Sequence, residues 1–247
     1  MSTILSTKEL HRHFGGVLAV NDVNAEFREN QVKSIIGPNG AGKTTLINVI
    51  TGWLPASSGT VLYKDRDITN KPTHELTKMG ISRTFQITSI FPGLTVFENV
   101  RIAKQTQRGG SFRIFSTKNS LKEVNAETWD ILDRLDLKET ARDRSANLAH
   151  GDQRLLEVAM ALAGEPKILF LDEPTAGMSP AETEHIAQLI KGLTDRISVV
   201  LVEHDMDVVM TISDEITVLR QGTIIANGPP KEIQNNDMVK EAYLGHN

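Results

Sequence analysis

One glycine-rich segment carries the most specific chemistry in this sequence. Its glycines allow backbone N–H groups to approach phosphate oxygens closely, and a helix start behind them favours an anion. Lys43 is placed to reach the β- and γ-phosphates of a nucleotide, and the Thr44 hydroxyl to take a Mg²⁺ position. The segment therefore predicts a nucleotide site. It matches the pattern G-x-x-x-x-G-K-[ST] in full through Gly37, Pro38, Asn39, Gly40, Ala41, Gly42, Lys43 and Thr44, with Thr45 next.

Two adjacent carboxylates lie farther along the chain, at the end of the apolar run at residues 168–171. Asp172 can hold Mg²⁺ through a shell of water molecules. Glu173, one residue on, can accept a proton from an attacking water. The same residues would also fit a solvated acidic turn after a strand, but their place after the glycine segment and before Pro174 favours a catalytic pair.

The elements that must position these residues are short apolar strands alternating with amphipathic stretches. This alternation predicts an α/β fold with a largely parallel sheet. The run at residues 168–171 is apolar on both faces, as expected where helices cover a sheet from both sides. Strands are predicted at Val32–Ile36, Ile168–Asp172 and residues 198–203, and antiparallel strands at residues 17–27 and 59–63.

Helices are predicted over most of residues 87–164, apart from a polar, exposed loop at residues 105–119. Capping boxes, in which a serine and a glutamate three residues later satisfy each other's backbone N–H groups, indicate where two helices begin. One box, Ser120 with Glu123, opens a helix to about Leu135, and the other, Ser179 with Glu182, opens a helix through Lys191.

The composition excludes several classes of function. The chain has 247 residues and a net charge of −4, which argues against a protein that binds nucleic acid by neutralising phosphates. It has no cysteine, which excludes disulfides, zinc–thiolate sites and cysteine nucleophiles. We expect no secretory signal, and the longest aliphatic runs are far shorter than the ~20 residues of a membrane helix. Any membrane role is therefore expected to require a partner.

Further short motifs occur in a particular order around the glycine segment and the carboxylates. They are Phe14 upstream, Arg83-Thr84-Phe85-Gln86, Leu148-Ala149-His150-Gly151-Asp152-Gln153-Arg154, Ala176-Gly177-Met178-Ser179-Pro180, and His204 after the strand at residues 198–203. Each motif is weak alone. Together, their order and spacing resemble the ATP-binding subunit of an ABC transporter over nearly the whole chain.

The resemblance implies a fold and a division of the chain. The expected fold is a P-loop NTPase (RecA-like) core with a mostly parallel sheet, an N-terminal antiparallel β-subdomain and an inserted helical subdomain. Residues 1–247 would form a single ABC ATPase domain. Within it, residues 1–86 and 165–247 would form the nucleotide-binding core and β-subdomain, and residues 87–164 the helical signature subdomain.

The resemblance also implies roles for single residues in binding ATP and Mg²⁺. Glu173 would polarise the attacking water, His204 would hold the γ-phosphate, and Gln86, the glutamine of a Q-loop, would bind near Mg²⁺. An aromatic residue at Phe14 would stack on adenine, although Phe14 alone would fit a core position. Val20 is left open as either a core residue or an adenine contact.

Two such chains face each other in this family, and each closes the nucleotide of the other with its signature helix. Here the signature departs from the common Leu-Ser-Gly-Gly-Gln pattern. Ala149 lacks a hydroxyl to offer a γ-phosphate, His150 replaces a glycine or aromatic residue, and Asp152 stands where glutamine is usual. We therefore expect phosphate contact here from backbone N–H groups at Gly151 and the helix N-terminus. Asp152 favours that helix end but opposes a nearby anion.

Several segments are similar to the branched-chain (hydrophobic) amino-acid uptake group, and within it to the longer of two ATPase subunits. They are residues 83–86, 91–100, the polar loop at 105–119, the Leu-Ala-x-Gly signature and the ending at residues 241–245. The resemblance implies a heterodimer with a second ATPase subunit, docking of transmembrane permease subunits on residues 87–164, and indirect action with an extracytoplasmic solute-binding protein. The chain would lie at the cytoplasmic face of the membrane. An ATPase for urea, amides, or lipid or lipopolysaccharide remains an alternative.

Other classes of protein with the same glycine segment fit less well. A soluble P-loop phosphotransferase would leave the signature and His204 unexplained. A GTPase would need an aspartate after Asn70-Lys71, where the sequence has Pro72-Thr73. A soluble ABC protein of translation or DNA repair commonly carries two ATPase units or a basic surface, and this chain has neither.

Overall fold

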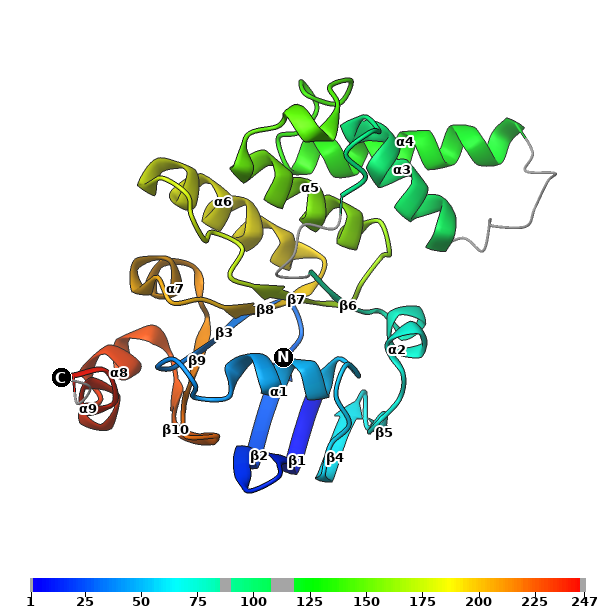
Figure 1. Ribbon diagram of the computed structural model, residues 1–247. Helices are drawn as coiled ribbons and strands as arrows, with labels where there is room; N and C mark the ends of the chain where they lie inside the picture. Colours follow the sequence, from blue (N-terminus) through cyan, green and yellow to red (C-terminus); the bar gives the residue numbers. More distant parts are fainter. Residues whose placement is uncertain (1, 85–89, 108–117, 245–247) are drawn as a thin grey trace.

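A six-stranded sheet lies at the centre of the molecule (Figure 1). The computed structural model describes residues 2–84, 90–107 and 118–244. Five strands of the central sheet run parallel, and the sixth pairs antiparallel at one edge. In spatial order they are β10 (Thr223–Gly228), β9 (Glu215–Arg220), β3 (Val32–Ile36), β8 (Ser198–Val202), β7 (Ile168–Asp172) and β6 (Ile81–Arg83). The mostly parallel sheet of the predicted fold class is confirmed.

A second, antiparallel sheet lies below the first in Figure 1, and α1 (Lys43–Ile50) packs between the two. Its strands, in spatial order, are β2 (Val17–Arg28), β1 (Thr3–Phe14), β4 (Ser58–Tyr63) and β5 (Arg66–Asp67). The antiparallel strands predicted at residues 17–27 and 59–63 are confirmed as β2 and β4. Strand β1 was missed because several register shifts against its neighbours interrupt the period-two alternation of its side chains.

Helices α3 to α6 cover the opposite face of the central sheet (Figure 1). The helices are α2 (Thr73–Met79), α3 (Val96–Gln107), α4 (Lys118–Arg134), α5 (His150–Leu162), α6 (Pro180–Gly192), α7 (Met206–Ile212), α8 (Pro230–Asn235) and α9 (Asp237–Leu244), with short 3₁₀ turns at Ser145–Asn147 and Leu193–Asp195. The capping box at Ser179 and Glu182 is confirmed, with both hydrogen bonds formed. The box predicted at Ser120 is wrong, because α4 begins at Lys118 and Ser120 lies inside it.

The central strands are buried on both faces. In β7, Ile168 and Phe170 join the core shared with α1 and the antiparallel sheet. Leu169 and Leu171 join the core shared with α3 to α6 on the opposite face. This alternation explains why the strand reads as a continuous apolar run. Among the described residues, no helix is both long and apolar enough to span a membrane.

Candidate nucleotide-binding site

The glycine segment at residues 37–44 connects β3 to α1 at the carboxyl end of the parallel strands. Two of its glycines are required by close packing. A Cβ on Gly37 would lie 2.1 Å from the carbonyl oxygen of Leu219, and one on Gly42 would lie 2.2 Å from that of Ala19. Both residues also have positive φ angles, which side-chain-bearing residues rarely adopt. The backbone of the loop is therefore fixed by its neighbours in a form that only glycine allows.

The middle of the loop faces open space. Gly40 has a φ of +77° and no atom within 4 Å of where its Cβ would lie, and Thr44 is exposed. Lys43 Nζ donates to the carbonyl oxygens of Gly37 at 2.7 Å and Pro38 at 3.2 Å, so its ammonium group lies over the loop. Burial lowers the pKa of Lys43, while the nearby Glu173 and Asp172 raise it. The loop thus combines a concave backbone with a fixed cation.

Asp172 ends β7 with only 2% of its surface exposed. Its Oδ2 accepts a hydrogen bond from Arg83 Nη2 at 2.8 Å, and this is an ion pair. Burial raises the pKa of Asp172, and the guanidinium group of Arg83 counters this effect. Asp172 Oδ1 is buried without a hydrogen-bond partner among the described residues. An unsatisfied buried carboxylate oxygen near the phosphate loop fits the water shell of a magnesium ion.

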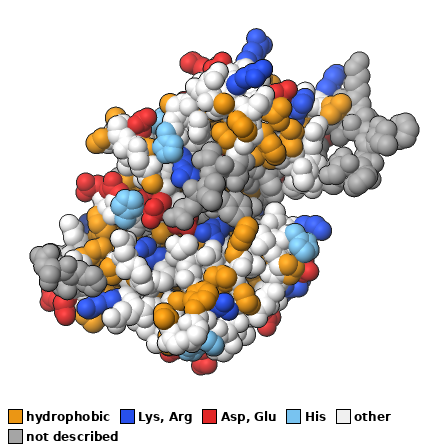
Figure 2. Space-filling model, viewed as in Figure 1, with side chains coloured by type: hydrophobic (Ala, Val, Ile, Leu, Met, Phe, Trp, Pro, Cys, Tyr) orange, Lys and Arg blue, Asp and Glu red, His pale blue; other side chains and the backbone are white. Residues whose placement is uncertain are grey.

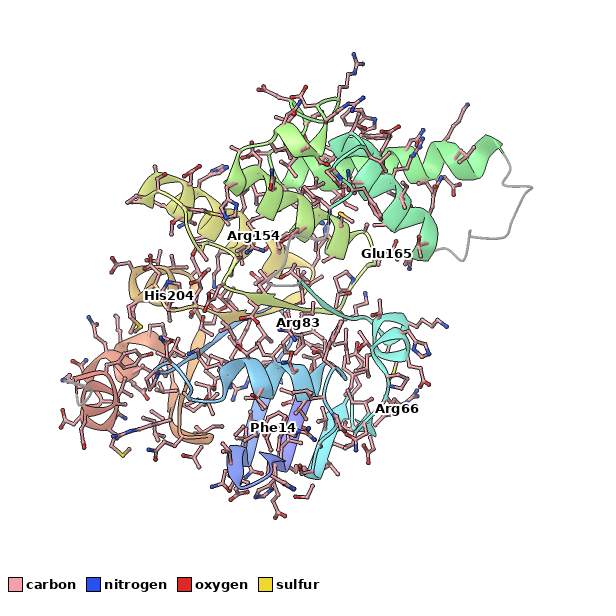
Figure 3. The ribbon with its side chains drawn as sticks, in the orientation of Figure 1. Phe14, Arg66, Arg83, Arg154, Glu165 and His204 are labelled. Atoms are coloured by element: carbon pink, nitrogen blue, oxygen red, sulfur yellow. The ribbon has the colours of Figure 1, made fainter. Side chains whose placement is uncertain are left out.

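Glu173 and His204 come together from the ends of two neighbouring strands. Glu173 has a left-handed backbone conformation with a φ of 49°, and its N–H donates to Val202 O at 2.8 Å. His204 Nδ1 lies 3.8 Å from Glu173 Oε1. The side chain of His204 is 64% exposed and that of Glu173 is 34% exposed. Both are therefore accessible to a ligand at the loop. His204 lies in the segment that joins β8 to α7, and Figure 3 shows it at α7.

Glu203 is a part of this site that the sequence analysis missed. Its side chain is fully buried. Its Oε1 accepts hydrogen bonds from the N–H of Thr175 at 3.1 Å and from its hydroxyl at 2.6 Å, and Oε2 accepts from the N–H of His204 at 3.2 Å. Glu203 therefore ties the turn after Glu173 to His204. A glutamate at the end of a strand gives no sequence signal that it turns inward.

The residues predicted to contact adenine have different surroundings. Phe14 is 44% exposed at the end of β1, and the Arg12 guanidinium carbon lies 4.5 Å from the centre of its ring. Figure 3 shows Phe14 at the antiparallel sheet. Val20 is completely buried in the core, so its side chain has no surface to offer a base and its core alternative is favoured. Gln86, predicted near Mg²⁺, lies outside the described residues.

The signature segment begins α5. Ala149 is the N-cap residue and provides no side-chain hydrogen bond, while Asp152 lies in the first turn. Gly151 is buried against the start of α6. His150 departs from the common signature pattern. Its Nε2 lies 3.3 Å from the carbonyl oxygen of Ala176, so its side chain contacts the segment between β7 and α6.

The signature helix and the phosphate-loop helix lie on opposite faces of the central sheet. Leu155 and Leu156 of α5 belong to the core shared with α3 to α6, whereas Leu46 and Ile47 of α1 belong to the core on the other face. The structure therefore brings together the loop, the carboxylate pair and His204, and it keeps the helix of the signature apart from them.

The fold and the loop define a P-loop nucleotide-binding protein of the α/β class. Comparison with known proteins then gives the family. Residues 20–176 match the family model described as "ABC transporter", and residues 223–247 match "Branched-chain amino acid ATP-binding cassette transporter". The chain belongs to the ABC transporter family, and it is an ATPase cassette of that family.

Relatives and solved structures are similar over the full length. The chain is 43% identical to "High-affinity branched-chain amino acid transport ATP-binding protein LivG" of Escherichia coli (strain K12), with 98% of each chain covered. It is 40% identical to "High-affinity branched-chain amino acid transport ATP-binding protein BraF" of Pseudomonas aeruginosa, also with 98% of each chain covered. A crystal structure of an ABC transporter cassette in its ADP conformation superposes with a TM-score of 0.87 and is 33% identical, covering all of both chains. The suspected resemblance to ABC transporter ATPases is confirmed.

Proposed function

We propose that this chain binds and hydrolyses ATP to power an importer of branched-chain or other hydrophobic amino acids. Its full-length similarity to LivG and BraF supports this solute class, as does the match of residues 223–247 to a branched-chain cassette model. The observation that carries the proposal is the grouping of Lys43, Asp172, Glu173 and His204 around one loop. That grouping supports hydrolysis as well as nucleotide binding.

The proposed chemistry assigns each side chain a step. Lys43 and the backbone of residues 37–42 hold the phosphates, and Thr44, Gln86 and Asp172 hold Mg²⁺, which neutralises phosphate charge when bound. Glu173 accepts a proton from the attacking water. His204 orients the γ-phosphate, and its distance of 3.8 Å from Glu173 supports a shared task at the same phosphate.

A second ATPase subunit is proposed to complete the site. The α5 and α1 helices pack on opposite faces of the central sheet, which supports the signature of one chain closing the nucleotide of another rather than its own. One solved structure of 28% identity is described as a dimeric ATP-binding cassette in a post-hydrolysis state with ADP and Pi. We infer a heterodimer from the resemblance of several segments to the longer of two ATPase subunits, and we expect release of phosphate to open it.

A groove of about 880 Å³ is proposed to receive a cytoplasmic segment of a permease subunit. It runs between α2 and β6 on one side and α3 and α5 on the other, and it includes Trp53 and Phe91, which are 52% and 48% exposed. Lys78 and Lys167 also line it. An apolar segment with acidic ends would complement these residues. Figure 2 shows hydrophobic side chains gathered on both the helical and the sheet-bearing halves of one face.

With this docking the chain would lie at the cytoplasmic face of a membrane, and a solute-binding protein would act on the other side. The docking also suggests a role for the proposed division of the chain. Residues 87–164, which would hold the permease, could move relative to residues 1–86 and 165–247, which would hold the nucleotide. Nucleotide state at the loop would reach the permease through that movement.

The test is co-expression of the chain with multi-spanning permease subunits from the same organism. We expect the subunits to purify together and, in liposomes with the binding protein, leucine, isoleucine or valine to stimulate ATP hydrolysis. A matched complex that carries Glu173→Gln should not transport. Purification without membrane subunits would contradict the transport role, and stimulation only by urea, an amide or a lipid would replace the solute.

A further inference from the structure

Arg83 is the residue that joins the carboxylate of Asp172 to the helix behind the phosphate loop. It ends β6, beside β7. Its Nη2 forms the 2.8 Å ion pair with Asp172 Oδ2, and its Nη1 donates to Asn48 Oδ1 in α1. The side chains of Arg83 and Asp172 are 8% and 1% exposed. Figure 3 shows Arg83 between the central sheet and α1, and its two Nη atoms contact one residue of each element.

This arrangement uses only one of the two oxygens of Asp172. A guanidinium group holds a carboxylate in a fixed plane more strictly than an ammonium group does, because its donors are rigidly arranged. With Oδ2 held by Arg83, the buried Oδ1 is the oxygen that has no hydrogen-bond partner among the described residues. The orientation of the oxygen left for a ligand therefore depends on Arg83.

We propose that Arg83 is a positioning residue for the magnesium ion of the nucleotide. It orients Asp172 so that Oδ1 receives a magnesium-bound water, and Asn48 orients Arg83 in turn. The proposal rests on the proposed role of Asp172 in holding Mg²⁺. Groups that orient a metal ligand typically change metal affinity or activity about 10- to 100-fold when they are removed.

The test measures the affinity of the full chain for ATP with excess Mg²⁺ and again with a chelator. For Arg83→Gln we expect the affinity for Mg²⁺–ATP to fall about tenfold or more and the affinity for metal-free ATP to stay unchanged. Arg66→Gln, at an exposed arginine of β5, is the matched control for loss of one positive charge and should alter neither affinity. Equal losses in both measurements would overturn the proposal, because they would indicate a general structural defect.

Two milder variants cover the case in which Arg83→Gln does not fold. Arg83→Lys retains the charge without the fork, and Asn48→Ala retains the ion pair while freeing the other arm of Arg83. Both should weaken Mg²⁺–ATP binding by a smaller factor than Arg83→Gln and leave metal-free binding intact. Normal Mg²⁺ dependence in both would overturn the proposal.

Asp172→Asn distinguishes the positioning role of Arg83 from the proposed role of Asp172 in holding Mg²⁺. A loss of Mg²⁺ dependence in Asp172→Asn, with normal behaviour of the Arg83 variants, would contradict only the role of Arg83. Normal Mg²⁺ dependence in Asp172→Asn would instead remove the metal role of Asp172 itself, and the role of Arg83 with it.

Discussion

The phosphate loop and the signature segment differ in how much of their polar surface is open to a ligand. In the loop, Gly40 faces open space and Thr44 is exposed. In the signature segment, Gln153 Nε2 donates to Leu148 O at 3.1 Å, and His150 contacts the carbonyl oxygen of Ala176. The loop leaves Gly40 and Thr44 open to a ligand and holds Lys43 over itself through its own carbonyl oxygens. The signature segment instead has Gln153 and His150 in contact with carbonyl oxygens of its own chain.

This difference indicates an unequal division of work in a closed pair of subunits. The loop, with its fixed cation and its nearby carboxylates, should supply most of the affinity for ATP and all of the groups that act on the attacking water. The signature segment should supply only backbone N–H groups and the positive end of α5. Variants of the loop site should therefore have large effects, and variants of the signature segment small ones.

The largest effect is expected from Glu173→Gln. Loss of the proposed proton acceptor for the attacking water should lower turnover ~10²- to 10⁴-fold, while ATP still binds. Steady-state ATP hydrolysis by the assembled transporter and equilibrium binding of ATP measure the two quantities separately. Glu184→Gln, at an exposed position of α6, is the control and should keep normal turnover. Normal hydrolysis by the Glu173 variant would remove Glu173 from its role.

Lys43→Ala should have the next largest effect, on binding rather than on turnover alone. A hydrogen bond to a charged group contributes about 1.5–3 kcal/mol, so the affinity for ATP should fall about tenfold to a hundredfold. Binding can be followed by calorimetry on the chain alone. The exposed Lys231→Ala serves as the charge-matched control. An unchanged affinity would mean that the loop backbone holds the phosphates without the cation, and the proposed division of work would need revision.

The sequence predicts those features of the two regions that depend on short, local patterns, and it does not predict contacts between residues that are distant along the chain. The loop motif and the strands β3 and β7 were predicted at the right positions, because each is a short pattern whose meaning needs no distant residue. Glu203 and the Arg83–Asp172 ion pair were not predicted. Arg83 and Asp172 come from separate strands that only the sheet order brings together, and the inward turn of Glu203 depends on Thr175.

The signature segment illustrates a second limit. Its departures at Ala149, His150 and Asp152 were visible in the sequence, and so was the missing hydroxyl. The contact of His150 with Ala176 was not, since it depends on how the segment between β7 and α6 folds back on α5. A pattern thus showed what the segment lacks, while only the structure shows what its side chains do instead.

Ala149→Ser should moderately increase both the stability of α5 and the contribution of the signature segment to subunit pairing. Ala149 is the N-cap of α5 and makes no capping hydrogen bond, and serine at such a position stabilises a helix by about 1 kcal/mol. The same hydroxyl would be available to a γ-phosphate, so ATP-dependent pairing of subunits should also increase. Denaturant unfolding and light scattering measure the two effects.

Ala149→Gly separates the two contributions of that hydroxyl. Glycine is also favoured over alanine at an N-cap, so it should stabilise α5 but add nothing to pairing. A serine variant that is more stable yet pairs no better than the glycine variant would show that the start of α5 does not meet phosphate. The signature would then contribute less than its position suggests.

The smallest effect is expected from Asp152→Asn, and its two parts should have opposite signs. Asp152 lies in the first turn of α5, where a negative charge stabilises a helix by about 0.3–1 kcal/mol, so the variant should unfold slightly more easily. In the proposed pair of subunits the same charge would repel a phosphate at that helix end, so ATP-dependent pairing should become stronger by a small factor. Because exposed charges are screened by salt, the gain should shrink as ionic strength rises.

Asp237→Asn is the matched control for this last prediction. Asp237 is an acidic residue in the first turn of α9, away from the signature, and its side chain is 98% exposed. Its variant should lose a similar small amount of stability and leave pairing unchanged. If Asp152→Asn lowered both stability and pairing, Asp152 would be acting only within its own helix. The difference between the two regions would then lie in the missing hydroxyl of Ala149 and not in the charge of the helix end.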